Sequence, residues 1–159
     1  MLTDDQIKDV WEGRISSEVR SLYFGDLASL YTRQKQWITG VSFFLSSGAA
    51  AMLVAKLPVL FPIISSIIVA LITAYAVAVN LDSKIRTMAK LHYAWNQLGD
   101  GYSRLWNHTY SEEAESELED LQRRALDLSE LATTDAPNDT KRLSRWQEHV
   151  FRLHRLVGA

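Results

Sequence analysis

The feature that most constrains this chain is an almost uncharged stretch, residues 37–81, whose only charged residue is Lys56. A transmembrane helix needs about 20 mostly apolar residues to cross roughly 30 Å of hydrocarbon. The halves on either side of the lysine, residues 37–55 and 57–81, both reach that length. We therefore expect a transmembrane hairpin of two helices. Its short turn would be Lys56-Leu57-Pro58, and both ends of the chain would lie on the same side of the membrane.

Composition fits a membrane protein with a charged cytosolic part. Charged residues make up 23% of the chain and the net charge is −2, yet the charges avoid the central block. The chain would thus divide into a cytosolic amphipathic leader (residues 1–36), the hairpin (37–81) and a cytosolic helical region (82–159). This is an all-α fold class: a two-helix hairpin with an N-terminal amphipathic helix and a C-terminal cytosolic helical bundle.

Basic residues flank the hairpin on one side. Two precede the first span and three follow the second, whereas the turn carries a single lysine: Arg33, Lys35, Lys84, Arg86 and Lys90 against Lys56. Because cytoplasmic flanks are enriched in Lys and Arg, we expect a multi-pass membrane protein with both termini in the cytoplasm and the turn outside.

The leader reads as one amphipathic helix. Thr3 and Gln6 have the spacing of a capping box, in which each side chain bonds the other residue's backbone N–H. Apolar residues then recur every three or four positions. Gly13 and Gly25 weaken the helix, so we expect a bend or break near one of them. The apolar face would pack on the other cytosolic helices or lie flat on the membrane.

Both spans carry small residues. On the second, four of them fall every four residues and form a ridge suited to helix–helix contact within the hairpin or between protomers: Ser66, Ala70, Ala74 and Ala78. On the first, Ser42 and Ser46 are candidate pore-lining residues of an oligomer. The other interpretation is that their hydroxyls bond their own helix and only pack.

After the second span we expect the helix to continue without interruption to about Asn107, with a broad apolar stripe. Ser111 would cap a further helix, Thr133–Asp139 would form a loop, and a last helix would follow. Acids crowd Glu112–Asp120 and bases crowd Lys141–Arg155. The last two helices would then form an antiparallel pair held by complementary charge, or else present two solvated faces.

Little in the chain suggests chemistry. There is no cysteine, and none of the four histidines has the spacing of a zinc-type pair. No glycine-rich phosphate loop or nucleophile elbow is found in the sequence. We expect no enzyme, no cofactor, no metal site and no nucleic-acid partner. His92 lies on the apolar stripe and is expected to pack there.

One stretch of the chain is similar to a known family. An arginine and aromatic residues precede the hairpin, and a helix with a further arginine, histidine and aromatics follows it: Arg20, Tyr23 and Tyr31-Thr-Arg33, then Arg86-Thr-Met-Ala-Lys-Leu-His-Tyr-Ala-Trp-Asn-Gln-Leu98, Tyr102 and Leu105. This pattern resembles the SLATT family of two-transmembrane effectors, associated with bacterial nucleotide signalling and anti-phage defence. Arg86, His92 and Tyr102 match its post-hairpin pattern, with no role expected beyond packing.

The resemblance implies a homo-oligomer that permeabilises the inner membrane when a sensor or nucleotide-signalling protein is triggered. The alternative is a membrane-anchored adaptor, in which the hairpin only tethers and the helices after Asn107 bind a protein partner.

Overall fold

The structure, a computed structural model, describes residues 1–54 and 60–154; side chains are described except at positions 49–54 and 61. The described residues form helices and the turns between them, with no strand. The helices are α1 (Asp4–Val54), α2 (Leu60–Val79), α3 (Leu81–Trp106), α4 (Ala114–Asp135) and α5 (Thr140–Leu153). The all-helical fold class is therefore confirmed. The expected turn at Lys56-Leu57-Pro58 and the end of the first span at Ala55 lie outside the described residues.

The chain forms two compact units, and α1 and α3 contribute to both. One unit combines residues 1–27 with residues 86–159, and the other is residues 28–85. We call the first the bundle and the second the hairpin unit.

The bundle is built on the inward face of α3. Six residues of its apolar stripe are at most 4% exposed, whereas His92 is half-buried and Trp106 is 38% exposed; the six are Met88, Leu91, Trp95, Leu98, Tyr102 and Leu105. These residues recur at intervals of three and four, so they lie on one face of the helix. Val10, Phe24 and Leu27 of α1 and Leu118 and Leu121 of α4 complete the core. The leader's apolar face up to Leu27 thus contributes to the bundle, whereas Leu30 is 37% exposed and belongs to the hairpin unit.

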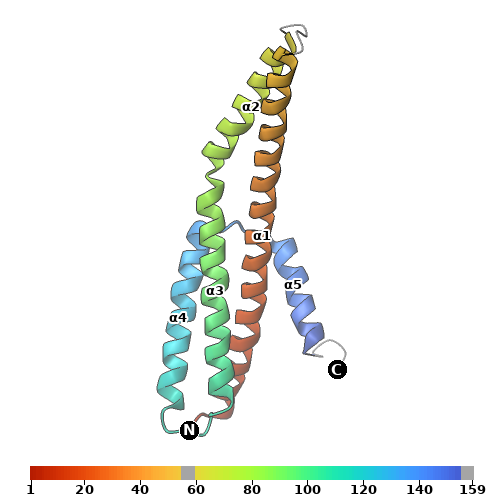
Figure 1. Ribbon diagram of the computed structural model, residues 1–159. Coiled ribbons are helices and arrows are strands. Elements are labelled where there is room, and N and C mark those ends of the chain that lie inside the picture. Colours follow the sequence, from red (N-terminus) through yellow and green to blue (C-terminus); the bar gives the residue numbers. More distant parts are fainter. Residues whose placement is uncertain (55–59, 155–159) are drawn as a thin grey trace. The chain divides into compact units, whose positions relative to one another are not determined.

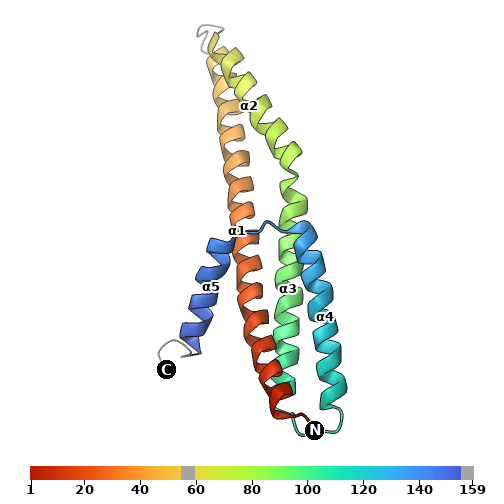
Figure 2. The ribbon, with the colours of Figure 1, turned by 180° about the vertical axis from the view of Figure 1, so that it is seen from behind.

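Helix α5 packs on α1. In both views α1 lies between α5 and the pair formed by α3 and α4 (Figures 1 and 2). Val150 is fully buried against Ile15 and Val19 of α1. Around them pack half-buried apolar side chains from the same two helices: Trp11, Leu22, Leu143, Trp146 and Phe151. The last two helices run antiparallel, but the contacts of α5 differ from the charge-paired hairpin considered above. Burial of a large apolar face outweighs exposed ion pairs, which contribute roughly 0–1 kcal/mol each.

In the hairpin unit, α2 runs antiparallel beside the second half of α1 (Figure 1). Side chains of both helices line a common groove: Gln34, Trp37, Ile38, Val41, Leu71, Ile72 and Tyr75. Along α2 the half-buried positions recur every three or four residues, at Ser65, Val69, Ile72, Ala76 and Val79. This is the face that α2 turns toward α1.

Glycines in the bundle are contact sites, and they do not interrupt a helix. At Gly13 an added Cβ would lie 2.5 Å from the ring of Tyr102, and at Gly25 it would lie 3.0 Å from His92. The expected break near one of them is therefore wrong, because α1 is helical through both. Close packing of a ring on the backbone offsets the low helix propensity of glycine.

Helix ends follow local chemistry. The capping box is confirmed: Gln6 Oε1 accepts from the Thr3 backbone N–H at 2.8 Å, and Thr3 Oγ1 accepts from the Gln6 N–H at 3.3 Å. The expectation that the second span continues into the next helix without interruption is wrong, since Asn80 adopts a positive φ of 49° between α2 and α3. Asparagine tolerates this left-handed conformation better than most residues.

The third helix ends at Trp106, as expected, but the next begins later than expected. Its N-terminus is Ala114 with Glu113 at the cap position, so Ser111 is not the cap. The helix then continues to Asp135, which shortens the expected Thr133–Asp139 loop. Asp139 caps α5 by accepting from the Arg142 backbone N–H at 3.0 Å.

Candidate functional site

The most unusual surface of the described chain is the apolar outside of α2. Within Pro62–Trp106 lies the one described helical stretch that is long and apolar enough, by length and composition, to cross a membrane, and only 6% of its apolar window is buried. The exposed large side chains are Leu60, Ile63, Ile64, Ile67, Ile68, Leu71, Tyr75 and Val77. Soluble monomers rarely expose contiguous apolar surface on this scale, and such patches mark protein or membrane contact.

The neighbouring part of α1 contributes to the same surface. Trp37, Phe43 and Phe44 are each about three-quarters exposed, at 75%, 74% and 76%. Aromatic and aliphatic side chains directed outward from both helices leave the hairpin unit with little apolar core of its own. A hydrocarbon environment would remove that surface from water.

Polar contacts join α1 to α2 and to the first residues of α3 at one end of this surface. Lys35 Nζ pairs with Asp82 Oδ1 at 2.6 Å, and the Gln34 amide donates to the Tyr75 hydroxyl at 3.5 Å. The Lys84 ammonium lies 5.8 Å from the centroid of the Tyr31 ring. We call these six residues the collar. Mixed aromatic and charged residues of this kind are typical of the membrane–water interface.

The four residues of the ridge, Ser66, Ala70, Ala74 and Ala78, are all exposed. Ser66 donates its hydroxyl to the Pro62 carbonyl at 2.8 Å, one turn back on its own helix. The ridge therefore faces away from α1, and the packing inside the hairpin uses the other side of α2.

The two candidate pore-lining serines have different surroundings. Ser42 is half-buried, and its hydroxyl oxygen is shielded from solvent with no hydrogen-bond partner among the described residues. Ser46, one turn further along α1, is exposed. A buried hydroxyl without a partner costs free energy, so Ser42 is the less satisfied of the two.

The positions shared with the family pattern lie on α3. Arg86 is exposed, His92 is half-buried and Tyr102 is 3% exposed. His92 Nδ1 lies 2.8 Å from the Ser21 carbonyl and 3.1 Å from the Ser21 hydroxyl, which ties α3 to α1. Burial, with a smaller contribution from Asp9, raises the pKa of Tyr102. His92 and Tyr102 thus have packing roles in the bundle.

A half-buried arginine links three elements of the bundle. The guanidinium of Arg20 lies 4.5 Å from the Trp95 ring centroid and donates to the Ser129 hydroxyl at 2.6 Å. Burial lowers the pKa of Arg20. Trp95 is 2% exposed, and its indole N–H has no hydrogen-bond partner in the part of the chain that the structure describes. The cation over the ring compensates in part for the buried indole.

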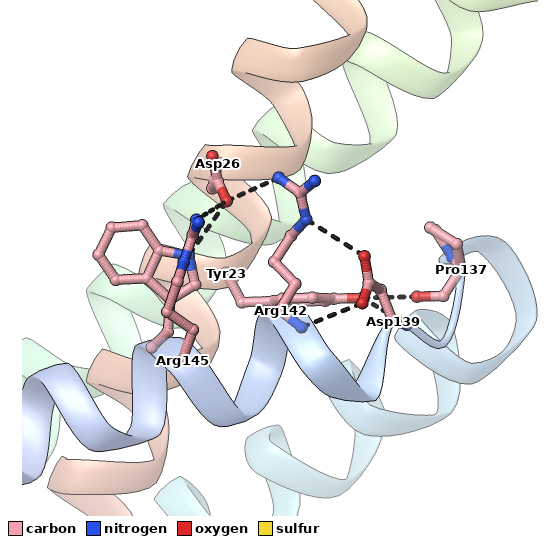
Figure 3. A network of polar contacts seen from close by, with 7 residues as sticks. Tyr23, Asp26, Pro137, Asp139, Arg142 and Arg145 are labelled. Atoms are coloured by element: carbon pink, nitrogen blue, oxygen red, sulfur yellow. Dashed lines mark hydrogen bonds and ion pairs between the residues drawn. The ribbon is translucent and has the colours of Figure 1, made fainter.

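Polar contacts fix the start of α5 to α1 (Figure 3). Asp26 Oδ2 accepts from Arg142 at 2.8 Å, from Arg145 at 2.9 Å and from the Trp146 indole N–H at 3.2 Å. Beside it, Tyr23 donates its hydroxyl to the Pro137 carbonyl at 2.6 Å and accepts from the Asp139 backbone N–H at 3.2 Å. We call this group the clasp.

The clasp lowers the pKa of both its acids. For Asp26, burial acts in the opposite direction, but hydrogen bonds from Trp146 and Arg142 and the two guanidinium charges outweigh it. For Asp139, the largest cause is the hydrogen bond from the Arg142 backbone N–H. Both carboxylates are therefore held in the charged form.

A groove of about 490 Å³ runs between α1 and α5. Its walls are mainly apolar, with polar groups from both helices: Trp11, Glu12, Ile15, Ser16, Val19, Arg20, Leu143, Gln147 and Phe151. At one end His154 Nε2 lies 2.8 Å from Glu18 Oε2. Among the described residues no group of three or more His, Asp or Glu side chains could hold a metal ion.

Sequence reasoning missed the clasp. The last helix's bases were considered only as a group facing the acids of Glu112–Asp120, with Arg152 and Arg155 beside them, and no partner was predicted for Arg142 or Arg145. In the structure, Asp120 instead pairs with Arg123 and Arg124 of its own helix. The available signal was the placement of Arg142, Arg145 and Trp146 on one face of the last helix.

No protein-family model matches the chain, and no curated protein and no solved structure matches it either.

Proposed function

We propose that this chain is an effector of the bacterial inner membrane that oligomerises and permeabilises the bilayer in an anti-phage or nucleotide-signalling defence system, as its resemblance to SLATT proteins suggests. In this proposal residues 37–81 form the transmembrane hairpin, both termini are cytoplasmic, and the bundle receives the signal from a sensor protein.

The observation that carries the proposal is the outward direction of the ridge. The four small side chains of the ridge lie about one turn apart and are exposed. The large side chains that α2 exposes beside them are apolar. Small residues allow two helices to approach closely in lipid, where van der Waals packing drives association. Because α1 does not pack on the ridge of α2, this surface remains available to a helix of a second protomer. The permeation path would then run along Ser42 and Ser46.

The test is propidium uptake and dye leakage on expression in bacteria. We expect uptake with the parent chain, and none with Ala70→Leu/Ala74→Leu, because leucines on the ridge keep neighbouring helices apart. A matched control is Ile64→Leu/Ile68→Leu, which changes exposed residues of the same helix off the ridge and should leave uptake intact. Equal uptake by all three chains, at equal membrane abundance, would remove the ridge from the mechanism.

The groove between α1 and α5 favours a second candidate function, a membrane-anchored adaptor that binds a protein partner. An apolar cleft with a few polar groups is the usual form of a binding site. Under this alternative, uptake is absent at every expression level, and filling the groove with Ser16→Trp removes partner binding while Lys8→Trp, on the exposed surface of the same helix, does not.

A further inference from the structure

In the hairpin unit α1 carries a second groove, which shares only Trp37 and Val41 with the groove between α1 and α2. Its volume is about 470 Å³, and its lining forms one stripe along the helix: Arg33, Gln36, Trp37, Gly40, Val41, Phe44 and Leu45. Gly40 is the floor, since an added Cβ there would meet no atom within 4 Å. The exposed rings of Trp37 and Phe44 stand on either side of it.

The groove changes character from one end to the other. Arg33 and Gln36 are exposed polar groups at its mouth, and the remaining side chains of the stripe are apolar or aromatic. Trp37 lies between the two parts, the position that amphipathic aromatic residues occupy at the headgroup level. The polar mouth, the interfacial Trp37 and the apolar remainder would face, in that order, the headgroup, the glycerol region and an acyl chain of a phospholipid.

Charge selects the headgroup. Lys35 is neutralised by Asp82, with 2.6 Å between the charged atoms. Arg33 forms no ion pair with any acid in the described part of the chain, so its guanidinium is available to bind an external anion. A guanidinium binds a phosphate through two parallel N–H bonds, which are stronger than bonds between neutral groups. Anionic lipids of the cytoplasmic leaflet supply that phosphate with a net negative charge.

The length of the groove fits an acyl chain of one leaflet. From Trp37 to Leu45 the helix rises about 12 Å at 1.5 Å per residue. One leaflet contributes about 15 Å of the hydrocarbon core. An acyl chain lying over Gly40 would therefore fill the groove within one leaflet.

We infer that this stripe of α1 is a binding site for an anionic phospholipid, with the phosphate at Arg33 and one acyl chain over Gly40. The inference rests on the proposed membrane placement of the hairpin, and it adds a ligand that neither pore formation nor tethering requires.

The test uses the full chain purified in non-ionic detergent, with native mass spectrometry to count bound lipids. Phosphatidylglycerol and phosphatidylcholine with the same acyl chains are added separately, and inorganic phosphate is added as a competitor. We expect phosphatidylglycerol to bind about tenfold more tightly than phosphatidylcholine, because the choline cation of phosphatidylcholine offsets the charge of the phosphate that Arg33 would bind. Millimolar phosphate should not displace it, because phosphate lacks the acyl chain.

Two variants and two controls locate the site. Arg33→Gln should remove the preference for phosphatidylglycerol, and Gly40→Leu should reduce binding of both lipids by filling the floor. Gly48→Leu and Arg104→Gln should change neither, because Gly48 is an open position on the same helix and Arg104 is an exposed base in the bundle.

Three outcomes would overturn the inference: equal binding of the two lipids, binding unchanged in Gly40→Leu, or displacement by phosphate alone. A Gly40→Leu chain that binds lipid normally but loses self-association would assign the face to a second copy of the chain. Insertion into phosphatidylcholine vesicles separates these failures from failure of the membrane placement. A chain that enters no vesicle contradicts the proposed function, and one that enters without lipid preference contradicts only this site.

Discussion

Tyr102 and Gly13 form the tightest contact at a glycine in the bundle. An added Cβ at position 13 would lie 2.5 Å from the ring of Tyr102, which is itself 3% exposed. We predict that Gly13→Ala lowers the free energy of unfolding by about 1–3 kcal/mol, the usual cost of overpacking. This loss exceeds the gain in helix propensity of about 1 kcal/mol. Thermal unfolding of the detergent-solubilised chain, followed by circular dichroism, measures it.

The control is Gly99→Ala in the same bundle. Its added Cβ would lie 3.5 Å from the Ser17 Cβ, an ordinary contact distance. This variant should be neutral or slightly stabilised, since only the propensity gain remains. A higher melting temperature for Gly13→Ala than for the parent would show that Tyr102 moves away without cost.

Periodicity predicted which residues of α3 are buried, from Met88 to Leu105. It did so because a helix facing a core must repeat its apolar residues every three or four positions. The effect of a glycine was not predictable in the same way. Propensity alone suggested a break near Gly13 or Gly25, and the tertiary partners that stabilise those positions come from α3, some 70 to 90 residues further along the chain.

At the scale of elements, the partner of α5 was the least predictable feature. Its apolar face and its bases suit any helix with an apolar strip and nearby acids, and both α1 and α4 qualify. The structure places Val150 in a cluster with Ile15 and Val19, so the buried area on α1 decides the packing. The break at Asn80 could not be predicted from periodicity either, because a single left-handed residue between two helices does not change the pattern of apolar residues.

The clasp makes the docking of α5 depend on pH. The folded pKa values of Asp26 and Asp139 both lie below the ordinary value of 3.8. Their contribution to stability is therefore complete above about pH 3.8 and is lost as the pH falls through the lower folded values. We predict that α5 loosens from α1 in this acidic range. The indole N–H resonance of Trp146, which is bonded to Asp26, reports the change by NMR.

Asp26→Asn tests the same element at neutral pH. The amide removes the negative charge, so the Trp146 resonance should already lie near its acid position at pH 6. The matched control, Asp127→Asn, alters an exposed acid of α4 that has no part in the clasp. In this variant the Trp146 resonance should change with pH as it does in the parent. An indole resonance that stays constant in the parent until the whole chain unfolds in acid would contradict the assignment of the clasp.

At the scale of the whole molecule, the hairpin hypothesis differs from a single span in where the two ends of the chain lie. If only α2 crossed the bilayer, residues before it and after it would be on opposite sides. Two crossings return the chain to the side where it began, and the exposed Trp37, Phe43 and Phe44 of α1 favour a second apolar segment in lipid. For two crossings, the basic flanks predict that both ends lie in the cytoplasm.

Because the chain has no cysteine, single cysteines report this topology without background. We predict that a membrane-impermeant maleimide added to intact cells with a permeabilised outer membrane labels Lys56→Cys but neither Lys8→Cys nor Asp127→Cys. All three should react after the inner membrane is opened with detergent, which controls for accessibility. Labelling of Asp127→Cys but not Lys8→Cys in intact cells would establish a single crossing. The groove on α1 would then lose the bilayer on which its lipid depends, and the ridge would have to act on one spanning helix alone.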